Sequence, residues 1–359
     1  MTTLFCVRPA TRNIGNDIIN RATTDLLFAV FGAETSIVTI PALVGSKNGG
    51  LTARQVYDIN RLADGVVVGG GNLFENGQLT VDEQALGALR RPMLLVGLAH
   101  GRIYGHEGSL VPRTDAMPAH VIRSLVDTSV LTMVRDHGTQ EILRTLAIRN
   151  VEVGGCPTLF MAPNPAGWTP DDHDGRVLIS VRQPDRMSIP PPLQRRVADD
   201  VRRLIAALRG AFGGPIVLAC HDYADLAFAA GFPDAPSIYF DGVERYVNAL
   251  RRCRPSVSYR LHAFLPCLAF GTPSIHLSYD ERGRGAVATA GMGEWDVDIT
   301  RERDVVDAVM TRAGQMERYQ TLRRQSAGTI AGLRETTMAG LACFAKAVSR
   351  PIGRMEMST

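Results

Sequence analysis

Lysine is almost missing from this sequence. The 359-residue chain holds 39 lysine and arginine residues, and only Lys47 and Lys346 are lysines. A lysine Schiff base, or the phosphate-binding lysine of a Walker-type loop, is therefore not expected. A bound anion would instead be held by arginine, whose planar guanidinium group donates paired hydrogen bonds to a carboxylate or a phosphate.

Long apolar runs and patterned cysteines are missing as well. No run approaches the roughly 18 uncharged apolar residues that a membrane-spanning helix needs. The first residues, MTTLFCVRPATRN, lack the basic and apolar segments of a signal peptide. The six cysteines form no CxxC pair and no cysteine-rich segment. These features predict a cytoplasmic protein with reduced thiols and no integral membrane segment.

The chain also lacks a dense basic block. Its 39 basic and 36 acidic residues give a net charge of +3, and the charges are spread along the sequence. Nucleic-acid binders usually carry a concentrated basic surface, so the pattern predicts no nucleic-acid partner. The sequence leaves the oligomeric state open.

What the chain does contain is two successive series of short apolar runs that alternate with amphipathic stretches. In the first series, runs at 4–7, 36–40, 64–70, 93–99, 130–136 and 151–155 predict strands, and a helix is expected from Asp17 to Phe31, closing at Gly32. In the second, runs at 176–182, 214–221, 236–240, 256–260 and 273–279 predict strands, with a helix at 194–210 and helices after Thr300. This alternation is typical of βα units around parallel sheets.

A stretch rich in proline, glycine and aspartate at 162–175 separates the two series and is the best linker candidate. The hydrophobic content of 45% is enough for two cores. We therefore predict an α/β protein of two Rossmann-like domains, 1–165 and 175–359, the second including the terminal helices. The domains would face a cleft in a GT-B-like arrangement, with ligands at the carboxyl ends of the strands.

Arg260 and His262 stand out in the segment SVSYRLHAFLPCLAFG, residues 256–271. They follow a predicted strand and precede a predicted helix, in which Pro266 would lie in the first turn and Gly271 at the end. A helix N-terminus with an arginine and a histidine suits an anion together with proton transfer. The alternative is an arginine paired with a neighbouring element and a histidine satisfied within the core.

The run RLHAFLPCLAFGTPSIHLSYD (260–280) resembles the signature of the polysaccharide pyruvyl transferase family. Further stretches agree with that family in the right order: NIGND (13–17), VVVGGGNLF (66–74), VRD (134–136), ISVR (179–182) and ACHDYAD (219–225). The resemblance spans most of residues 1–300, and its most specific parts are the RLH segment and the glycine triplet. The chain departs from the family at Cys156, because the family commonly has aspartate before the proline that is Pro157 here.

The resemblance implies an enzyme that transfers a pyruvyl group from phosphoenolpyruvate to two hydroxyls of a glycan, glycolipid or small polyol as a ketal, and releases phosphate. The first domain would be the acceptor side and the second the donor side. No metal or other cofactor is expected, because arginines and a helix N-terminus can stabilise the charge that moves to phosphate. His262 is the first choice for the acid or base and His221 the second. The predicted substrate-binding residues are Arg260, Arg182, Leu261, Asn16, Asp17, Gly70, Gly71 and Asn72.

Each of these residues also has a purely structural interpretation. Asn16 and Asp17 would be expected to cap the first long helix, which is the favoured interpretation from the residues alone. The glycines 69–71 would allow a sterically tight turn. His221 follows a predicted strand, and in the structural interpretation it would be a surface residue without a role in the site.

Two other functions stay open at this point. A GT-B glycosyltransferase with a nucleotide-sugar donor shares the pattern, but such enzymes often carry two acids eight residues apart. Here the residue eight positions after Glu281 is Thr289, and the residue eight positions before Glu294 is Ala286, so neither glutamate has an acidic partner at that spacing. The third hypothesis is a catalytically silent relative that binds an anion. The sequence does not identify the acceptor or the hydroxyls that would be bridged.

Overall fold

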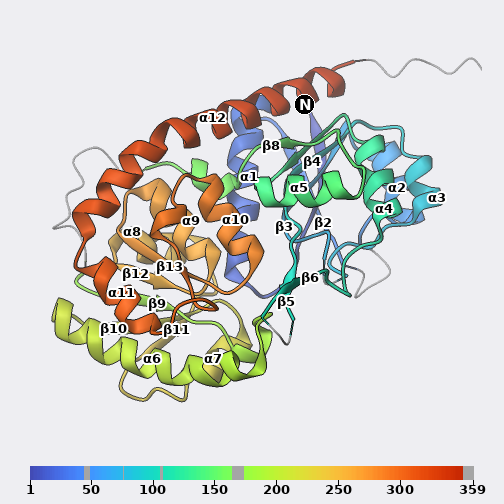
Figure 1. Ribbon diagram of the computed structural model, residues 1–359. Helices are drawn as coiled ribbons and strands as arrows, with labels where there is room; N and C mark the ends of the chain where they lie inside the picture. Colours follow the sequence, from blue (N-terminus) through green and yellow to red (C-terminus); the bar gives the residue numbers. More distant parts are fainter. Residues whose placement is uncertain (44–48, 76, 106–107, 164–173, 351–359) are drawn as a thin grey trace, which may run out of the picture.

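The computed structural model describes residues 1–43, 49–75, 77–105, 108–163 and 174–350. Within these ranges the chain forms two six-stranded parallel sheets with helices packed around them (Figure 1). The predicted linker falls largely on residues 164–173, outside the described ranges. The predicted α/β fold with a GT-B-like pair of parallel sheets is confirmed, while the proposed domain limits stay a prediction.

The first sheet has the strand order β2-β1-β3-β4-β7-β8. Its strands are β1 (Thr3–Arg8), β2 (Ser36–Pro41), β3 (Gly65–Gly71), β4 (Met93–Leu98), β7 (Leu131–Val134) and β8 (Glu152–Val153), and its helices are α1 (Ile14–Phe31), α2 (Ala53–Leu62), α3 (Glu83–Gly87), α4 (Ala119–Thr128) and α5 (His137–Thr145). Every residue of β3 and β4 is buried, as expected for parallel strands covered on both faces. A short antiparallel pair, β5 (Ile103–Tyr104) and β6 (Leu110–Val111), stands apart from the sheet.

The second sheet has the order β11-β10-β9-β12-β13-β14. Its strands are β9 (Val177–Ser180), β10 (Ile216–Cys220), β11 (Ser237–Tyr239), β12 (Ser256–Ser258), β13 (Ser274–Ser278) and β14 (Val297–Asp298), and its helices are α6 (Pro191–Phe212), α7 (Tyr223–Ala229), α8 (Val243–Arg252), α9 (Leu261–Phe270), α10 (Glu281–Thr289) and α11 (Val305–Ala313). The predicted strands and helices of both series are thus present.

Each sheet has a point where the chain order reverses. In the first sheet this point lies between β1 and β3, and in the second between β9 and β12. The loops that leave two such strands run in opposite directions, which opens a crevice at the carboxyl ends of the strands. The fold therefore places the residues after β1, β3, β9 and β12 at these crevices, and one cavity is lined by residues from all four segments.

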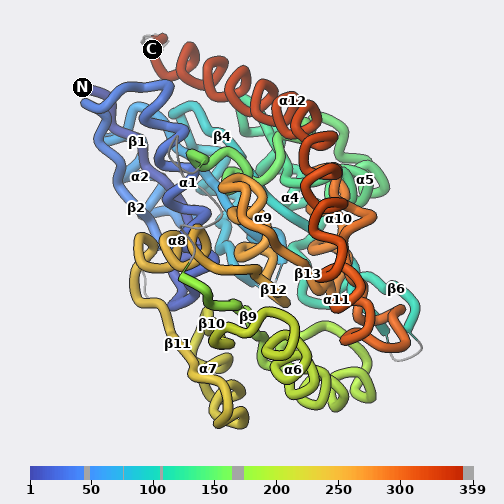
Figure 2. Tube along the Cα trace, turned by 90° about the vertical axis from the view of Figure 1, so that its left-hand side faces the viewer, coloured from blue at the N-terminus to red at the C-terminus, as the bar shows by residue number. Residues whose placement is uncertain are grey.

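The last helix, α12 (Met316–Val348), is 33 residues long and runs along both sheets (Figures 1 and 2). Tyr319 and Leu333 pack in the core of the second sheet, and Leu341 and Phe344 pack in a core of the first. Phe344 also meets Phe31 of α1 edge to face, with ring centroids 5.8 Å apart. The C-terminal helix therefore joins the two sheets on the side of α1.

Two local predictions were wrong. Asn13, not Asn16 or Asp17, caps α1: its side chain accepts a hydrogen bond from the Gly15 backbone N–H at 3.0 Å, so the helix begins at Ile14. Pro266 lies inside α9 and not in its first turn. The helix starts earlier than expected, and it is kinked at His262, where φ is −84° and ψ is 20°. The kink lies one turn before the proline, where the proline ring would otherwise meet a helical carbonyl.

Candidate active site

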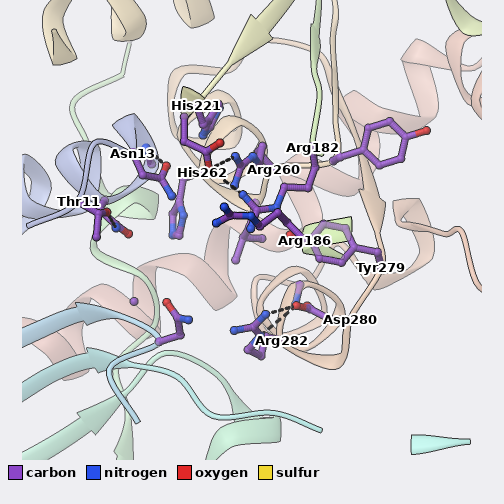
Figure 3. Close-up of a pocket in the computed structure, with 18 of the residues that line it drawn as sticks. Thr11, Asn13, Arg182, Arg186, His221, Arg260, His262, Tyr279, Asp280 and Arg282 are labelled. Carbon is purple, nitrogen blue, oxygen red and sulfur yellow. Dashed lines mark hydrogen bonds and ion pairs between the residues drawn. The ribbon is translucent and has the colours of Figure 1, made fainter. Parts of the chain in front are cut away.

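A cavity of about 680 Å³ lies at the carboxyl ends of the strands, between the two sheets. Its charged lining is strongly cationic. The lining includes seven arginines, Arg12, Arg113, Arg135, Arg182, Arg186, Arg260 and Arg282, against two carboxylates, Asp222 and Asp280. Figure 3 shows Arg182, Arg186 and Arg260 pointing toward the same part of the cavity. A cavity with this balance of charge suits an anionic ligand.

Arg182 and Arg260 sit on either side of the reversal point of the second sheet, just after β9 and β12. Arg182 Nη1 donates to Asp222 Oδ2 at 2.8 Å, and Arg260 Nη2 donates to the same oxygen at 2.9 Å. Arg260 also forms an ion pair with Asp225 and donates from Nε to the Val181 carbonyl at 3.3 Å. These contacts fix both guanidinium groups before any ligand arrives, which lowers the entropy cost of binding an anion.

Asp222 stays charged in this cluster. Burial raises the pKa of its carboxyl group, but the guanidinium groups of Arg260 and Arg182 outweigh burial and hold the pKa below its usual value. Two arginines therefore share two aspartates, Asp222 and Asp225, and the cluster is close to neutral without a ligand.

His262 and His221 line the same cavity, and both are uncharged at pH 7. Burial, followed by the nearby Arg135 and Arg260, lowers the pKa of His262 to about 3. Burial, followed by Arg260 and His262, lowers the pKa of His221 well below its ordinary value. The Nε2 atom of His262 lies 3.8 Å from the Cys156 sulfur, so the position at which the sequence departs from the family faces this ring.

The N-terminus of α1 forms the opposite wall. The backbone N–H of Ile14 donates to the His221 carbonyl at 3.1 Å and ties this wall to the second sheet. Asn13, Asn16 and Asn72 line this side of the cavity. Asn16 donates from Nδ2 to Thr11 Oγ1 at 2.6 Å, which orients its amide.

Most of the predicted site residues come together here. Those that line the cavity are His262, His221, Arg260, Arg182, Leu261, Asn16, Gly71 and Asn72. Asp17 and Gly70 lie outside its lining. At Gly70, φ is +87° and an added Cβ would lie 2.6 Å from Ile19 Cγ2, so this glycine serves a tight turn against α1. The catalytic and binding roles of the lining residues stay predictions.

Sequence reasoning missed several ionisable residues that line the cavity, namely Arg12, Arg113, Arg135, Arg186, His276, Asp280 and Arg282. Arg135 and Arg282 follow β7 and β13, and Arg135 Nη2 donates to the Arg282 carbonyl at 3.2 Å. The signal that points to both is their place directly after, or within a few residues of, a buried strand.

Arg282, in α10 beside the second sheet, forms an ion pair with Glu75, which follows β3 of the first sheet. Arg282 Nη1 donates to Glu75 Oε2 at 2.6 Å, and the Glu75 side chain is fully buried. Glu75 also contacts His100 Nδ1 at 3.1 Å. Because a buried carboxylate without a cation is costly, this contact holds the loop after β3 against α10.

Two kinds of feature are not seen in the described part of the chain. Its residues form no group of three or more histidine, cysteine, aspartate or glutamate side chains placed to hold a metal ion. Among its helices, none is long and apolar enough to cross a membrane.

Solved structures with a similar fold include a UDP complex, a glycosyltransferase and a UDP-GlcNAc 2-epimerase, according to their descriptions. Staphylococcus aureus MnaA in complex with UDP is 13% identical, with a TM-score of 0.61 over 98% of each chain. A glycosyltransferase from Rickettsia africae is 13% identical, with a TM-score of 0.56 over 98% of this chain and 99% of that one. The Methanocaldococcus jannaschii UDP-GlcNAc 2-epimerase, with UDP-GlcNAc and UDP, is 12% identical, with a TM-score of 0.52 over 86% and 92%. At these identities the likeness concerns the fold alone.

No curated protein matches the chain. The family model described as polysaccharide pyruvyl transferase matches residues 13–281, which is more than half of the sequence. The match runs from the cap of α1 to the start of α10 and so includes the N-terminus of α1 and the residues after β3, β9 and β12. The chain therefore belongs to the polysaccharide pyruvyl transferase family.

Proposed function

We propose that this protein transfers a pyruvyl group from phosphoenolpyruvate to two hydroxyls of a glycan, a glycolipid or a small polyol, forming a cyclic ketal and releasing phosphate. The observation that carries the proposal is the pair Arg182 and Arg260, fixed by Asp222 beside the uncharged His262. Phosphoenolpyruvate is the donor substrate, and the proposed reaction uses no cofactor and no metal.

The donor has a phosphate and a carboxylate on three carbons, and the cationic wall offers paired donors for both. Arg182 and Arg260 would bind one anionic group, because their guanidinium groups are already held side by side. Arg186 lies next to them and Arg282 lies across the cavity from them (Figure 3), and Arg135 also lines the cavity. Arginine is suited to both groups because its donors match the spacing of two carboxylate or phosphate oxygens.

The chemistry needs one proton donor and one proton acceptor. Protonation of the methylene carbon makes C2 electrophilic, and the first hydroxyl oxygen bonds to C2 and loses its proton. The C2–O bond to phosphate then breaks, and the second hydroxyl bonds to C2 and loses its proton. Of the two protons lost, one balances the proton gained by the methyl carbon, and the other leaves on phosphate. We assign the first proton transfer to His262.

The acceptor would lie against the wall built by α1 and the loop after β3. Asn13, Asn16 and Asn72 offer amide groups there. An amide both donates and accepts hydrogen bonds, as a sugar hydroxyl does, so this wall suits an uncharged polyol better than a second anion.

The proposal is tested by calorimetric titration of the purified protein with phosphoenolpyruvate. Arg182→Gln is the preferred variant, because Arg260 also neutralises Asp225, and removing it would leave a buried charge. The loss of one charge-assisted contact should weaken binding by about 1.5 to 3 kcal/mol, which is roughly 10- to 100-fold. Arg245→Gln is the control, since the exposed Arg245 of α8 pairs with the exposed Asp241, which precedes this helix.

His262→Gln should bind phosphoenolpyruvate nearly as well as the native protein and should not turn it over. Titration with UDP-N-acetylglucosamine runs in parallel. Tight binding of the nucleotide sugar, with no response to phosphoenolpyruvate, would reject the proposal in favour of a glycosyltransferase. Binding of neither would point to a silent relative.

A further inference from the structure

Tyr246 connects the two histidines of the cavity from behind. It lies on α8 and is fully buried. Its hydroxyl oxygen is 2.7 Å from His221 Nε2 and 3.2 Å from the carbonyl oxygen of His262. Its ring packs edge to face on the His221 ring, with centroids 5.0 Å apart. Neither the sequence motifs nor the proposed reaction uses this residue.

Three groups surround the tyrosine hydroxyl: the His221 ring, the His262 carbonyl and the Ser180 hydroxyl, which can either donate or accept a hydrogen bond. The carbonyl decides where the tyrosine proton lies. The His262 carbonyl can only accept a hydrogen bond. The residue four positions later in the helix, which would normally donate to this carbonyl, is Pro266, and proline has no N–H. A buried carbonyl needs a donor, and the Tyr246 hydroxyl supplies it. Burial also raises the pKa of Tyr246 well above its ordinary value, so the hydroxyl keeps its proton.

This fixes which atom is the donor in the hydrogen bond between the Tyr246 hydroxyl and His221 Nε2. Because the hydroxyl has a single proton and donates it to the His262 carbonyl, its oxygen accepts from His221. The proton of the neutral His221 ring is therefore on Nε2, and Nδ1 carries a lone pair.

The Nδ1 atom lies beside Gly15, in the first turn of α1. A Cβ atom added to Gly15 would be 3.2 Å from His221 Nδ1 and 3.1 Å from Asn13 Oδ1. The backbone of His221 is held on both sides, because its carbonyl accepts from Ile14 N and its N–H donates to Asp225 Oδ2 at 3.2 Å. The lone pair thus lies at a fixed place on the wall where the acceptor would bind.

We propose that Tyr246 is a positioning residue that fixes His221 as the Nε2–H tautomer, so that Nδ1 is the atom that takes the proton of the attacking hydroxyl. The second part rests on the proposed function. In that step the hydroxyl oxygen bonds to C2 of the protonated donor, its O–H bond breaks, and the proton goes to Nδ1. A weak base is sufficient, because an oxygen bonded to a cationic carbon is strongly acidic. His262 and His221 therefore divide the work of acid and base.

The experiment is long-range ¹H–¹⁵N NMR of the histidine side chains at neutral pH, in the native protein and in Tyr246→Phe. The native protein should show His221 as the Nε2–H tautomer. In Tyr246→Phe the ring packing is kept and the hydrogen-bond acceptor for Nε2–H is lost, so the tautomer ratio should shift by about 10-fold toward Nδ1–H. His221→Gln assigns the signals.

Tyr319→Phe is the matched control. Tyr319 is also fully buried, and its hydroxyl donates to the Thr272 carbonyl at 2.9 Å, away from the cavity. It should lose similar stability without any change at His221. A native His221 protonated at Nδ1 would overturn the proposal, even if the variant did not fold. An unchanged tautomer in folded Tyr246→Phe would overturn it as well. The tautomer is measured without a ligand, so failure of phosphoenolpyruvate binding would count against the proposed function and not against the role of Tyr246 in setting the tautomer.

Discussion

Binding of the proposed donor should draw a proton onto His262. In the free protein the pKa of this histidine is about 3, because the ring is buried and lies near Arg135 and Arg260. The ring is therefore neutral at pH 6. Phosphoenolpyruvate would bring its negative charge next to these arginines and would cancel their effect on the ring.

The size of the effect follows from Coulomb's law. One negative charge about 4 Å from the ring contributes about 4 kcal/mol at an effective dielectric constant of about 20. One pKa unit corresponds to about 1.4 kcal/mol, so the proton affinity rises by about three powers of ten. The pKa of His262 in the complex should then be about 6, and about half a proton should be taken up at pH 6.

The assay is calorimetric titration with phosphoenolpyruvate at pH 6 in two buffers with different enthalpies of ionisation. The difference between the two apparent binding enthalpies gives the number of protons taken up. His262→Gln keeps a polar group and cannot be protonated, so the native value should exceed the variant value by about half a proton. His120→Gln is the control, because the His120 side chain is 67% exposed on the surface. Equal values for the native protein and His262→Gln would refute the reasoning.

Three further variants test other parts of the structure. Cys156→Asp should raise the pKa of His262 by placing a carboxylate beside Nε2, which NMR titration would detect; an unchanged pKa would mean that the two side chains do not interact. Gly70→Ala should destabilise the protein by more than Gly213→Ala, since both glycines have positive φ but only Gly70 has an atom within 3 Å of an added Cβ; equal melting temperatures would contradict the steric argument. Glu75→Gln should cost about 1.5 to 3 kcal/mol in the free energy of unfolding, because it removes the charged contact of Glu75 with Arg282, while Arg282 keeps its pair with Asp280. Denaturant titration would show no loss if the contact with Glu75 were unimportant.

The sequence predicted the strands well and their order not at all. Runs such as 64–70 and 93–99 are apolar enough to be parallel strands in any order. Arg182 and Arg260 were found because each directly follows such a run and matches a family motif. Arg135 also follows a buried strand, but only the strand order shows that β7 and β13 bring it near Arg282. Contacts between distant strands leave no periodic signal in the chain.

The cap of α1 shows a second limit of local reasoning. Asn13, Asn16 and Asp17 are all good N-cap residues, and spacing alone does not choose among them. The choice is made by packing, because Ile14 is buried and its N–H is bonded to the His221 carbonyl in the other half of the protein. Similarly, no local pattern marks Tyr246, since a tyrosine on an amphipathic helix is ordinarily part of the core.

The long helix α12 has a consequence for how the protein unfolds. Its first turns are anchored in the core of the second sheet and its last turns in a core of the first. If either sheet melted, half of this helix would lose its apolar partners and the interface with the remaining sheet would be weakened at once. The two sheets should therefore unfold as one cooperative unit in calorimetry, although each has its own hydrophobic interior.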